Sequence, residues 1–260
     1  MSNRKFALIF ILAAIAASAW CVNAAKAQII TDGLVSYWTF DRADVDGDTV
    51  KDIVGINDGV MEGGKIVDDG KINAAIEFDG SSYVDCGTDE SLNLTDALTI
   101  ELWMNPASAG EGGPNAGPAC RAIDGGSWNW QLRYNAPGGN YMGFQFNAVP
   151  GGAMWISVQE NLEPEEWHHI TGTFDGSEAV CYLNAVETQR APMTGINSSA
   201  DNFFIGQDGW INCFDGLVDE LRMYDRALSE AEIEHNYVST IQLAVDPSSK
   251  LAVTWGFIKN

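Results

Sequence analysis

The chain has 260 residues, 46% of them hydrophobic, and carries 14 Lys and Arg against 36 Asp and Glu, a formal net charge of −22 at pH 7. Such an acidic surface repels nucleic acid and anionic lipid and tolerates divalent cations, so we expect no nucleic-acid partner. The length and apolar content suit one large domain with a full core.

The first 27 residues have the features of a secretory signal peptide. Arg4 and Lys5 form a positive start, residues 6–20 are an apolar run, and residues 25–27 (Ala-Lys-Ala) form a small-x-small cleavage site. The run is short for a membrane span, which needs about 20 apolar residues. We therefore predict a secreted, periplasmic or cell-surface protein that does not insert into the membrane after signal cleavage.

Short runs of strand-forming residues follow, separated by turns that contain Pro, Gly, Asn or Asp. About a dozen short strands with such turns predict an all-β sandwich or barrel. The predicted strands cover residues 34–40, 74–79, 83–86, 98–105, 128–134, 141–147, 153–159, 167–174, 179–183, 202–206 and 217–224.

The last of these strands contains a misplaced acid. Strict alternation puts Asp219 on the face that carries Leu217 and Leu221. A carboxylate among apolar side chains is costly unless it is paired, hydrogen-bonded or bound to a metal. Asp219 is therefore the first candidate for a functional residue.

One helix is predicted near the end of the chain, over residues 230–237. Ser229 as N-cap and Glu232 three residues later form a capping box. The final residues, 241–260, contain two short apolar runs around an Asp-Pro-Ser turn. They are compatible with an extra hairpin, a docking tail or disorder.

Four cysteines remain after signal cleavage, and four cysteines allow three pairings. Cys86 and Cys181 occupy strand positions that suit buried thiols, whereas Cys120 and Cys213 fall in predicted loops. Export would make disulfide formation possible. The loop positions of Cys120 and Cys213 favour this pair.

Seven segments occur in a characteristic order, over residues 33–41, 54–59, 74–87, 92–106, 165–177, 181–185 and 214–233. This series resembles a laminin-G-like domain of the concanavalin A-like lectin/glucanase superfamily, in its bacterial pentraxin-like branch. The resemblance implies a jelly-roll sandwich of two antiparallel sheets with one short C-terminal helix, in which the first and last strands lie side by side. It covers residue 33 to about residue 237, and we predict one domain over residues 28–240, followed by the tail 241–260. One departure is Asn184-Ala185, where the family usually has Asn-Gly.

The same resemblance implies a calcium site. Five carboxylates lie within residues 41–52, and Ca²⁺ prefers such oxygen ligands. Carried over to this sequence, the site consists of Asp41, Asp52, Asn57 and Asp219. The alternative is a solvated acidic loop with Asp219 hydrogen-bonded to backbone amides.

Three aromatic residues are candidates for ligand contact. Trp128 starts a strand, Tyr141 follows two glycines, and Trp210 lies in a polar loop. Exposed aromatic rings flanked by amides and carboxylates suit sugars, since rings stack on C–H faces and polar groups bond hydroxyls. Other tryptophans, Trp103, Trp155 and Trp167, are expected in the interior.

Catalytic signatures are weak. His168 and His169 are adjacent in a strand and point to opposite faces, and no G-x-S-x-G motif is present. The same alternation separates Asp219 from Glu220, so the pair of carboxylates that a glycosidase needs is not apparent. We therefore predict a non-catalytic, calcium-stabilised module that binds carbohydrate or an extracellular protein. The alternatives are a glycoside hydrolase of the same superfold and a structural or surface-assembly protein.

Overall fold

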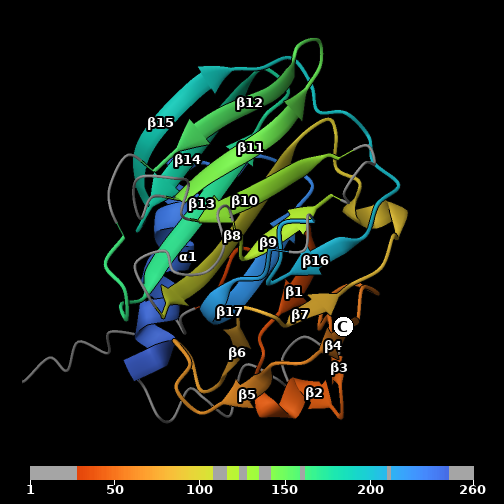
Figure 1. Cartoon of the computed structure of the whole chain (residues 1–260). Helices are drawn as coiled ribbons and strands as arrows, with labels where there is room; N and C mark the ends of the chain where they lie inside the picture. The colour runs from red at the N-terminus through yellow and green to blue at the C-terminus, as the bar shows by residue number, and fades with distance from the viewer. Residues whose placement is uncertain are drawn as a thin grey trace, which may run out of the picture.

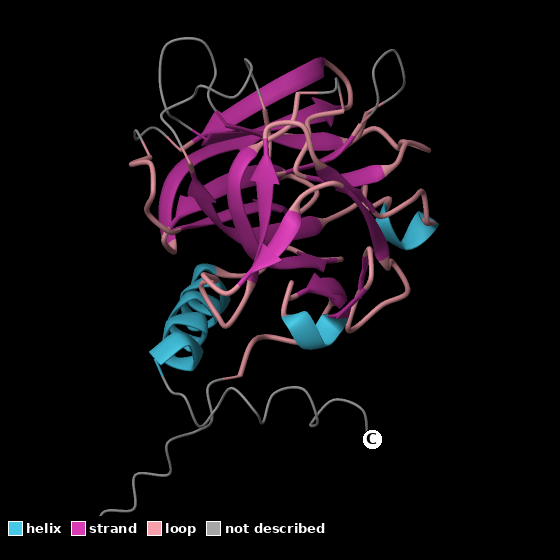
Figure 2. Cartoon of the chain, turned by 60° about the horizontal axis from the view of Figure 1, so that its bottom comes forward, coloured by secondary structure: helices cyan, strands magenta, loops and turns pink. Residues whose placement is uncertain are grey.

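A computed structural model describes residues 28–107, 116–122, 128–134, 142–158, 162–209 and 212–245, with side chains described as far as residue 240. The predicted signal peptide and most of the predicted tail lie outside these ranges. The described chain forms two antiparallel sheets packed face to face, with one long helix against the outside of the strands (Figures 1 and 2). The predicted all-β sandwich is confirmed.

The eight-stranded sheet has the order β15-β14-β13-β8-β17-β6-β5, with β1 also pairing with β17. Its strands are β1 (Leu34–Trp38), β5 (Lys65–Val67), β6 (Ala75–Asp79), β8 (Leu98–Pro106), β13 (His168–Phe174), β14 (Glu178–Leu183), β15 (Val186–Pro192) and β17 (Asp215–Tyr224).

The nine-stranded sheet has the order β12-β11-β10-β9-β16-β7-β4-β3-β2. Its strands are β2 (Val45–Asp46), β3 (Thr49–Val50), β4 (Gly59–Glu62), β7 (Tyr83–Asp85), β9 (Ala119–Arg121), β10 (Trp130–Tyr134), β11 (Met142–Ala148), β12 (Gly152–Ser157) and β16 (Phe203–Ile205). Two 3₁₀ helices, η1 (Arg42–Asp44) and η2 (Glu90–Leu92), lie in the connections.

Alternate residues of both sheets fill the core between them, as the period of a strand requires. The rings of Trp38 in β1 and Phe203 in β16 stack across the sandwich with centroids 5.3 Å apart. Phe144 and Phe146 of β11 are fully buried in the same cluster. These residues show that the apolar alternation marks the inward face.

The first and last strands pair, as the resemblance implies. Trp38 of β1 lies opposite Leu221 of β17, and the backbone amide of Asp225 donates to the carbonyl of Gly33 at 2.9 Å. β17 also pairs with β6 and β8, so one strand joins segments from both ends of the chain.

A β-bulge in β17 corrects the predicted face of Asp219. Asp219 lies opposite Trp103 and Arg222 lies opposite Glu101, so β17 has one residue more than β8 between these two pairs. The extra residue is Glu220, whose φ is +54°. The acid at 219 therefore does not share the inward face with Leu221.

The helix α1 (Glu230–Val245) begins as predicted and ends later. The backbone amide and hydroxyl of Ser229 both donate to the carboxylate of Glu232 at 2.8 Å, which confirms that these two residues cap the start. The helix continues past residue 237 because its next turns also reach the protein. Ser239 and Thr240 are buried and bond to Gln28 and Arg222.

The predicted disulfide is not formed in the structure. No disulfide joins any two cysteines among the described residues. Cys120 lies in β9 and not in a loop, and its side chain packs with Ala122 and Phe204. Cys213 pairs with Gln207 in an isolated bridge. Burial raises the pKa of the Cys120 thiol well above its ordinary value, so this thiol is a poor nucleophile for exchange.

Candidate functional site

Asp41 and Asp219 come together at the turn before β6. The Asp41 carboxylate accepts from the side-chain amide of Asn73 at 2.8 Å and from the backbone amide of Ala74 at 3.2 Å. The Asp219 carboxylate accepts from the backbone amide of Ile72 at 2.9 Å. Two acids from distant parts of the sequence therefore hold one three-residue segment.

These acids are poorly solvated. Burial raises the pKa of Asp41 to about 6, and burial together with the nearby Glu220 raises the pKa of Asp219 well above its ordinary value. The Oδ1 atom of Asp219 is buried and has no hydrogen-bond partner among the described residues. A buried carboxylate oxygen without a partner is costly, and a cation is one way to remove the cost.

Asp52 and Asn57 serve a different loop. The Asp52 carboxylate accepts from the backbone amides of Tyr37, Val54, Gly55 and Asn57 at 2.9–3.2 Å. The Asn57 side-chain amide donates to the hydroxyl of Ser36 at 2.8 Å. The side chains of Asp52 and Asn57 therefore bond to the loop before β4 and to β1. Asp41 and Asp219, in contrast, both bond to the segment at residues 72–74.

A calcium ion fits part of this arrangement. Carboxylates at Asp41 and Asp219 supply hard oxygen donors, and the partnerless oxygen of Asp219 suits a cation. Among the described residues, however, no group of three or more His, Cys, Asp or Glu side chains is arranged to hold a metal ion. Backbone carbonyls would have to complete the coordination.

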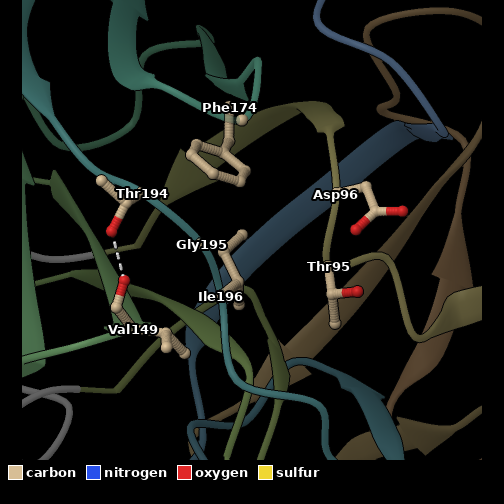
Figure 3. A pocket seen from close by; sticks show the side chains of 8 residues that line it. Thr95, Asp96, Val149, Phe174, Thr194, Gly195 and Ile196 are labelled. Carbon is tan, nitrogen blue, oxygen red and sulfur yellow. Dashed lines mark hydrogen bonds between the residues drawn. The ribbon is translucent and has the colours of Figure 1, made fainter.

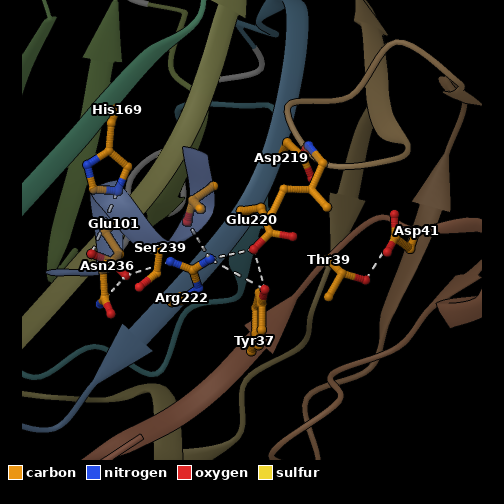
Figure 4. A network of polar contacts seen from close by, with 12 residues as sticks. Tyr37, Thr39, Asp41, Glu101, His169, Asp219, Glu220, Arg222, Asn236 and Ser239 are labelled. Carbon is orange, nitrogen blue, oxygen red and sulfur yellow. Dashed lines mark hydrogen bonds and ion pairs between the residues drawn. The ribbon is translucent and has the colours of Figure 1, made fainter. Parts of the chain in front are cut away.

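Beyond Asp219, a buried charge network lies between the eight-stranded sheet and α1 (Figure 4). The guanidinium of Arg222 donates to Glu101 at 2.9 Å and to Glu220, which also accepts from the hydroxyl of Tyr37. The side-chain amide of Asn236 in α1 donates to Glu101 at 2.8 Å. Such a network adds little net stability, but its directional bonds fix where the helix lies.

The histidines give no support to acid–base catalysis. His168 is bonded to the carbonyl of Glu163 and lies opposite the core residue Met104, while His169 lies under α1 beside Trp103 and Tyr237. The two histidines therefore point to opposite faces, as predicted. Burial lowers the pKa of His169 to about 3, so this side chain stays neutral at physiological pH. Trp103 is buried on the outer face of its sheet, against Tyr237, rather than in the core.

Trp155 is the exposed aromatic residue that the sequence interpretation placed wrongly. It lies opposite Gln145 on the outer face of the nine-stranded sheet, and 39% of its surface is exposed. A Cβ atom on Gly143 would come within 3.1 Å of the indole, so the ring covers bare backbone. The alternation of Met154 and Ile156 toward the core was the signal for this orientation.

Polar groups surround this indole. The guanidinium of Arg133 lies 5.4 Å from the ring centroid of Trp155 and donates to the side-chain oxygen of Gln145 at 3.1 Å. Gln131 donates to the same oxygen at 2.6 Å. We call Trp155, Arg133, Gln145 and Gln131 the Trp155 patch. Gln131 and Gln145 are themselves buried, so the exposed indole and the partly exposed guanidinium of Arg133 are the groups of this patch that a ligand can reach. A flat ring beside a guanidinium can stack on a sugar and bond its hydroxyls.

The predicted ligand residues fall near the same face or outside the described chain. Trp128 is half-buried and packs on Cys120 and Phe204, further along the outer face from Trp155. Tyr141 and Trp210 lie outside the described residues. The described neighbour of Trp210, Asp208, lies 3.9 Å from Arg133, so this loop borders the Trp155 patch.

A shallow pocket of about 340 Å³ lies at a loop-rich end of the sandwich (Figure 3). The hydroxyl of Thr194 donates to the carbonyl of Val149 across one side of it. One carboxylate and two hydroxyls give it little polar character for a specific ligand. It is lined by Thr95, Asp96, Val149, Phe174, Gly176, Thr194, Gly195 and Ile196.

The described strands define a jelly-roll sandwich of two antiparallel sheets. The chain belongs to the concanavalin A-like lectin/glucanases superfamily, because a laminin-G model of that superfamily matches residues 78–234. No curated protein sequence matched the chain significantly.

Solved structures share the fold at low sequence identity. The binding domain of Paraclostridial Mosquitocidal Protein 1 is 21% identical, with a TM-score of 0.62 over 79% of this chain and 52% of that one. Domain 4 of an extracellular GH43 arabinanase from Geobacillus stearothermophilus, solved with arabinotriose, is 22% identical. Its TM-score is 0.58 over 78% of this chain and 98% of that one. Trypanosoma rangeli sialidase is 16% identical, with a TM-score of 0.62 over 84% and 34%. The chain therefore spans about half of the toxin domain and a third of the sialidase.

Proposed function

We propose that this chain is a secreted, non-catalytic module that binds carbohydrate through the Trp155 patch and is stabilised by calcium. The observation that carries the proposal is the exposed indole of Trp155 over Gly143, with Gln145 and Arg133 beside it. Stacking on a sugar needs a fixed aromatic face, and the absent side chain at Gly143 lets the ring lie against the sheet.

The relatives support binding of this kind. The arabinanase domain was solved with arabinotriose, and the toxin relative is itself a binding domain. A protein ligand is the second candidate, since the binding domain of a botulinum neurotoxin of the same fold was solved with rat synaptotagmin II. No helix in the described part of the chain is long and apolar enough to cross a membrane.

Non-catalytic binding agrees with the position of the acids. Asp219, Glu220 and Glu101 are buried beneath α1 or the neighbouring turn, on the sheet opposite the Trp155 patch. A substrate stacked on Trp155 would meet the guanidinium of Arg133 rather than a pair of carboxylates. Release of reducing sugar from a polysaccharide would contradict this part of the proposal.

Calcium would act on the fold rather than on the ligand. Asp41 and Asp219 would hold it, and the charge of the ion would offset the desolvation of both carboxylates. Its binding would fasten the segment at residues 72–74 to β17. The Trp155 patch lies on the other sheet, so the ion would not contact a sugar there.

A glycan array run with and without Ca²⁺ tests the proposal. We expect binding to a defined set of saccharides, lost in Trp155→Ala and retained in the control Val186→Ala, an exposed residue of the other sheet. Losing a stacking ring and its contacts should weaken binding by about tenfold or more. Equal binding by wild type and Trp155→Ala would place the site elsewhere, and absence of any saccharide binding would favour the protein ligand.

A further inference from the structure

The loop between β3 and β4 carries three exposed aliphatic side chains. Ile53 is 37% exposed, Val54 is 44% exposed and Ile56 is 77% exposed. We call residues 53–56 the aliphatic loop. Adjacent exposed β-branched residues on a soluble domain are typical of a surface that another segment covers.

This loop cannot turn its side chains inward, because its backbone is fixed. The carboxylate of Asp52 accepts from the backbone amides of Val54 and Gly55 within the loop, and from Tyr37 beside it. A Cβ atom on Gly55 would lie 2.5 Å from the carbonyl of Val35, so the loop lies directly against β1. The aliphatic side chains are therefore held outward.

The sequence after α1 has the complementary character. In residues 251–258 (LAVTWGFI), Leu251, Val253, Trp255 and Phe257 share one face of an extended strand, a period-2 pattern with a strongly apolar side. Lys250 and Lys259 flank this run. Residues 246–260 lie outside the described part of the chain.

Charge around the aliphatic loop complements those two lysines. Exposed acids at Asp46 and Asp48 precede the loop and Glu62 follows it, while Asp58 is already paired with Lys51 at 2.7 Å. The backbone amide of Met61 donates to the carbonyl of Asp48 at 2.7 Å, so the two acidic groups lie next to each other in space. An apolar strand with a lysine at each end fits an apolar loop bordered by acids.

The end of α1 lies close enough for this docking. The hydroxyl of Thr240 contacts Arg222 at 3.3 Å, Arg222 contacts the hydroxyl of Tyr37 at 3.4 Å, and the carbonyl of Tyr37 accepts from the amide of Ile53 at 2.9 Å. Five residues separate Val245, the last residue of the helix, from residue 251, and the six Cα–Cα steps between the two extend to about 20 Å. The tail can therefore reach the loop of its own chain.

We propose that residues 251–258 dock in extended form on the aliphatic loop of the same chain, with Leu251, Val253, Trp255 and Phe257 facing the loop. The docked tail covers the outer side of the loop beside β1 and joins the two ends of the domain. This role concerns a surface distinct from the Trp155 patch, so it stands or falls independently of carbohydrate binding.

Hydrogen exchange measured by mass spectrometry tests the docking on the full chain and on a chain ending at Val245. We expect the amides of residues 53–57 to exchange about tenfold faster without the tail. Trp255→Asp should produce the same acceleration, whereas Thr254→Asp, on the opposite face of the predicted strand, should not. A synthetic peptide of residues 246–260 should restore protection to the shortened chain.

Two results would overturn the proposal. Identical exchange of residues 53–57 in the full and shortened chains would show that the tail does not cover the loop. Protection that grows with protein concentration, together with a dimer in sedimentation, would show that the tail covers the loop of a second copy instead. Ile56→Asp in the full chain serves as the reciprocal variant and should accelerate exchange of the loop without unfolding the sandwich.

Discussion

Glu220 decides which way its neighbours in β17 point. Because it is the inserted residue of a bulge, Asp219 and Arg222 both lie on the outer face while Val218 and Leu221 remain in the core. Strict alternation of the sequence could identify Asp219 as unusual but could not place it, since one inserted residue reverses the face of everything before it. Trp155 is the opposite case, because simple alternation with Met154 and Ile156 gives its true orientation.

Ala185 is a residue-scale test of backbone strain. It has φ of +65° and follows Asn184 at φ of +50°, in the two-residue connection between β14 and β15. Left-handed backbone costs an alanine roughly 1–2 kcal/mol in the folded state. Glycine removes this strain, but it loses more backbone entropy than alanine on folding, which offsets part of the gain. Ala185→Gly should therefore raise the free energy of unfolding by about 0.5–1 kcal/mol, as measured by urea denaturation.

The matched control is Ala191→Gly in β15 of the same hairpin. Glycine inside a strand lowers stability, so this variant should shift the urea midpoint in the opposite direction. If both variants destabilise the protein, the positive φ of Ala185 is not a source of strain.

At the scale of elements, long strands with clear alternation were predictable and short polar ones were not. β8 and β13 were found nearly to the residue. The inward positions of β8 are uniformly apolar, and those of β13, which pairs with it, include Ile170 and Phe174. β2 and β3 are two residues each inside an acidic loop, and β15 is an exposed edge strand with Glu, Gln and Arg. Such strands form because the neighbouring strands offer hydrogen-bond partners, and their local sequence has no pattern that predicts a strand.

The start of α1 gives a prediction about pH. Hydrogen bonding by Arg226 and Ser229 lowers the pKa of Glu232 to about 2, below the value near 4.5 expected in the unfolded chain. A carboxylate with a lowered folded pKa contributes stability above the unfolded pKa, and this contribution is lost as pH falls from about 4.5 to about 2. Glu232→Gln should therefore lower the melting temperature at pH 7 and have little effect near pH 2.

Glu234→Gln is the control on the same helix, since Glu234 is an exposed acid of α1 that does not cap its start. Melting curves of both variants across pH 2–7 make the comparison. A deficit for Glu232→Gln that persists unchanged at pH 2 would mean that packing, rather than the charged cap, accounts for its effect.

At the scale of the whole molecule, the order of the laminin-G-like sequence segments predicted the sandwich and the pairing of its first and last strands. The candidate sites were less predictable, because each depends on what distant segments cover. Asp52 and Asn57 resemble metal ligands in sequence, yet the fold uses them to order the backbone next to β1. The Trp155 patch likewise exists only because β10, β11 and β12 lie side by side.

Calcium is the whole-molecule prediction. An ion that binds only the folded chain stabilises it, so the melting temperature should rise by several degrees in Ca²⁺ relative to a chelator. Asp219→Asn should abolish this rise, whereas Asp48→Asn, an exposed acid of the same acidic loop, should retain it. Identical melting of the wild type in both conditions would remove calcium from the proposed function.

The position of β17 also sets the order in which the protein can assemble. β1 and β6 both pair with this strand on one side and β8 pairs on the other, yet β17 ends at Tyr224. These three earlier strands therefore lack this shared neighbour until residues 215–224 have been made. Such distant pairing gives a high contact order and slow folding, and it keeps a growing chain from completing its sheet early. A sheet of this topology closes only when β17 arrives.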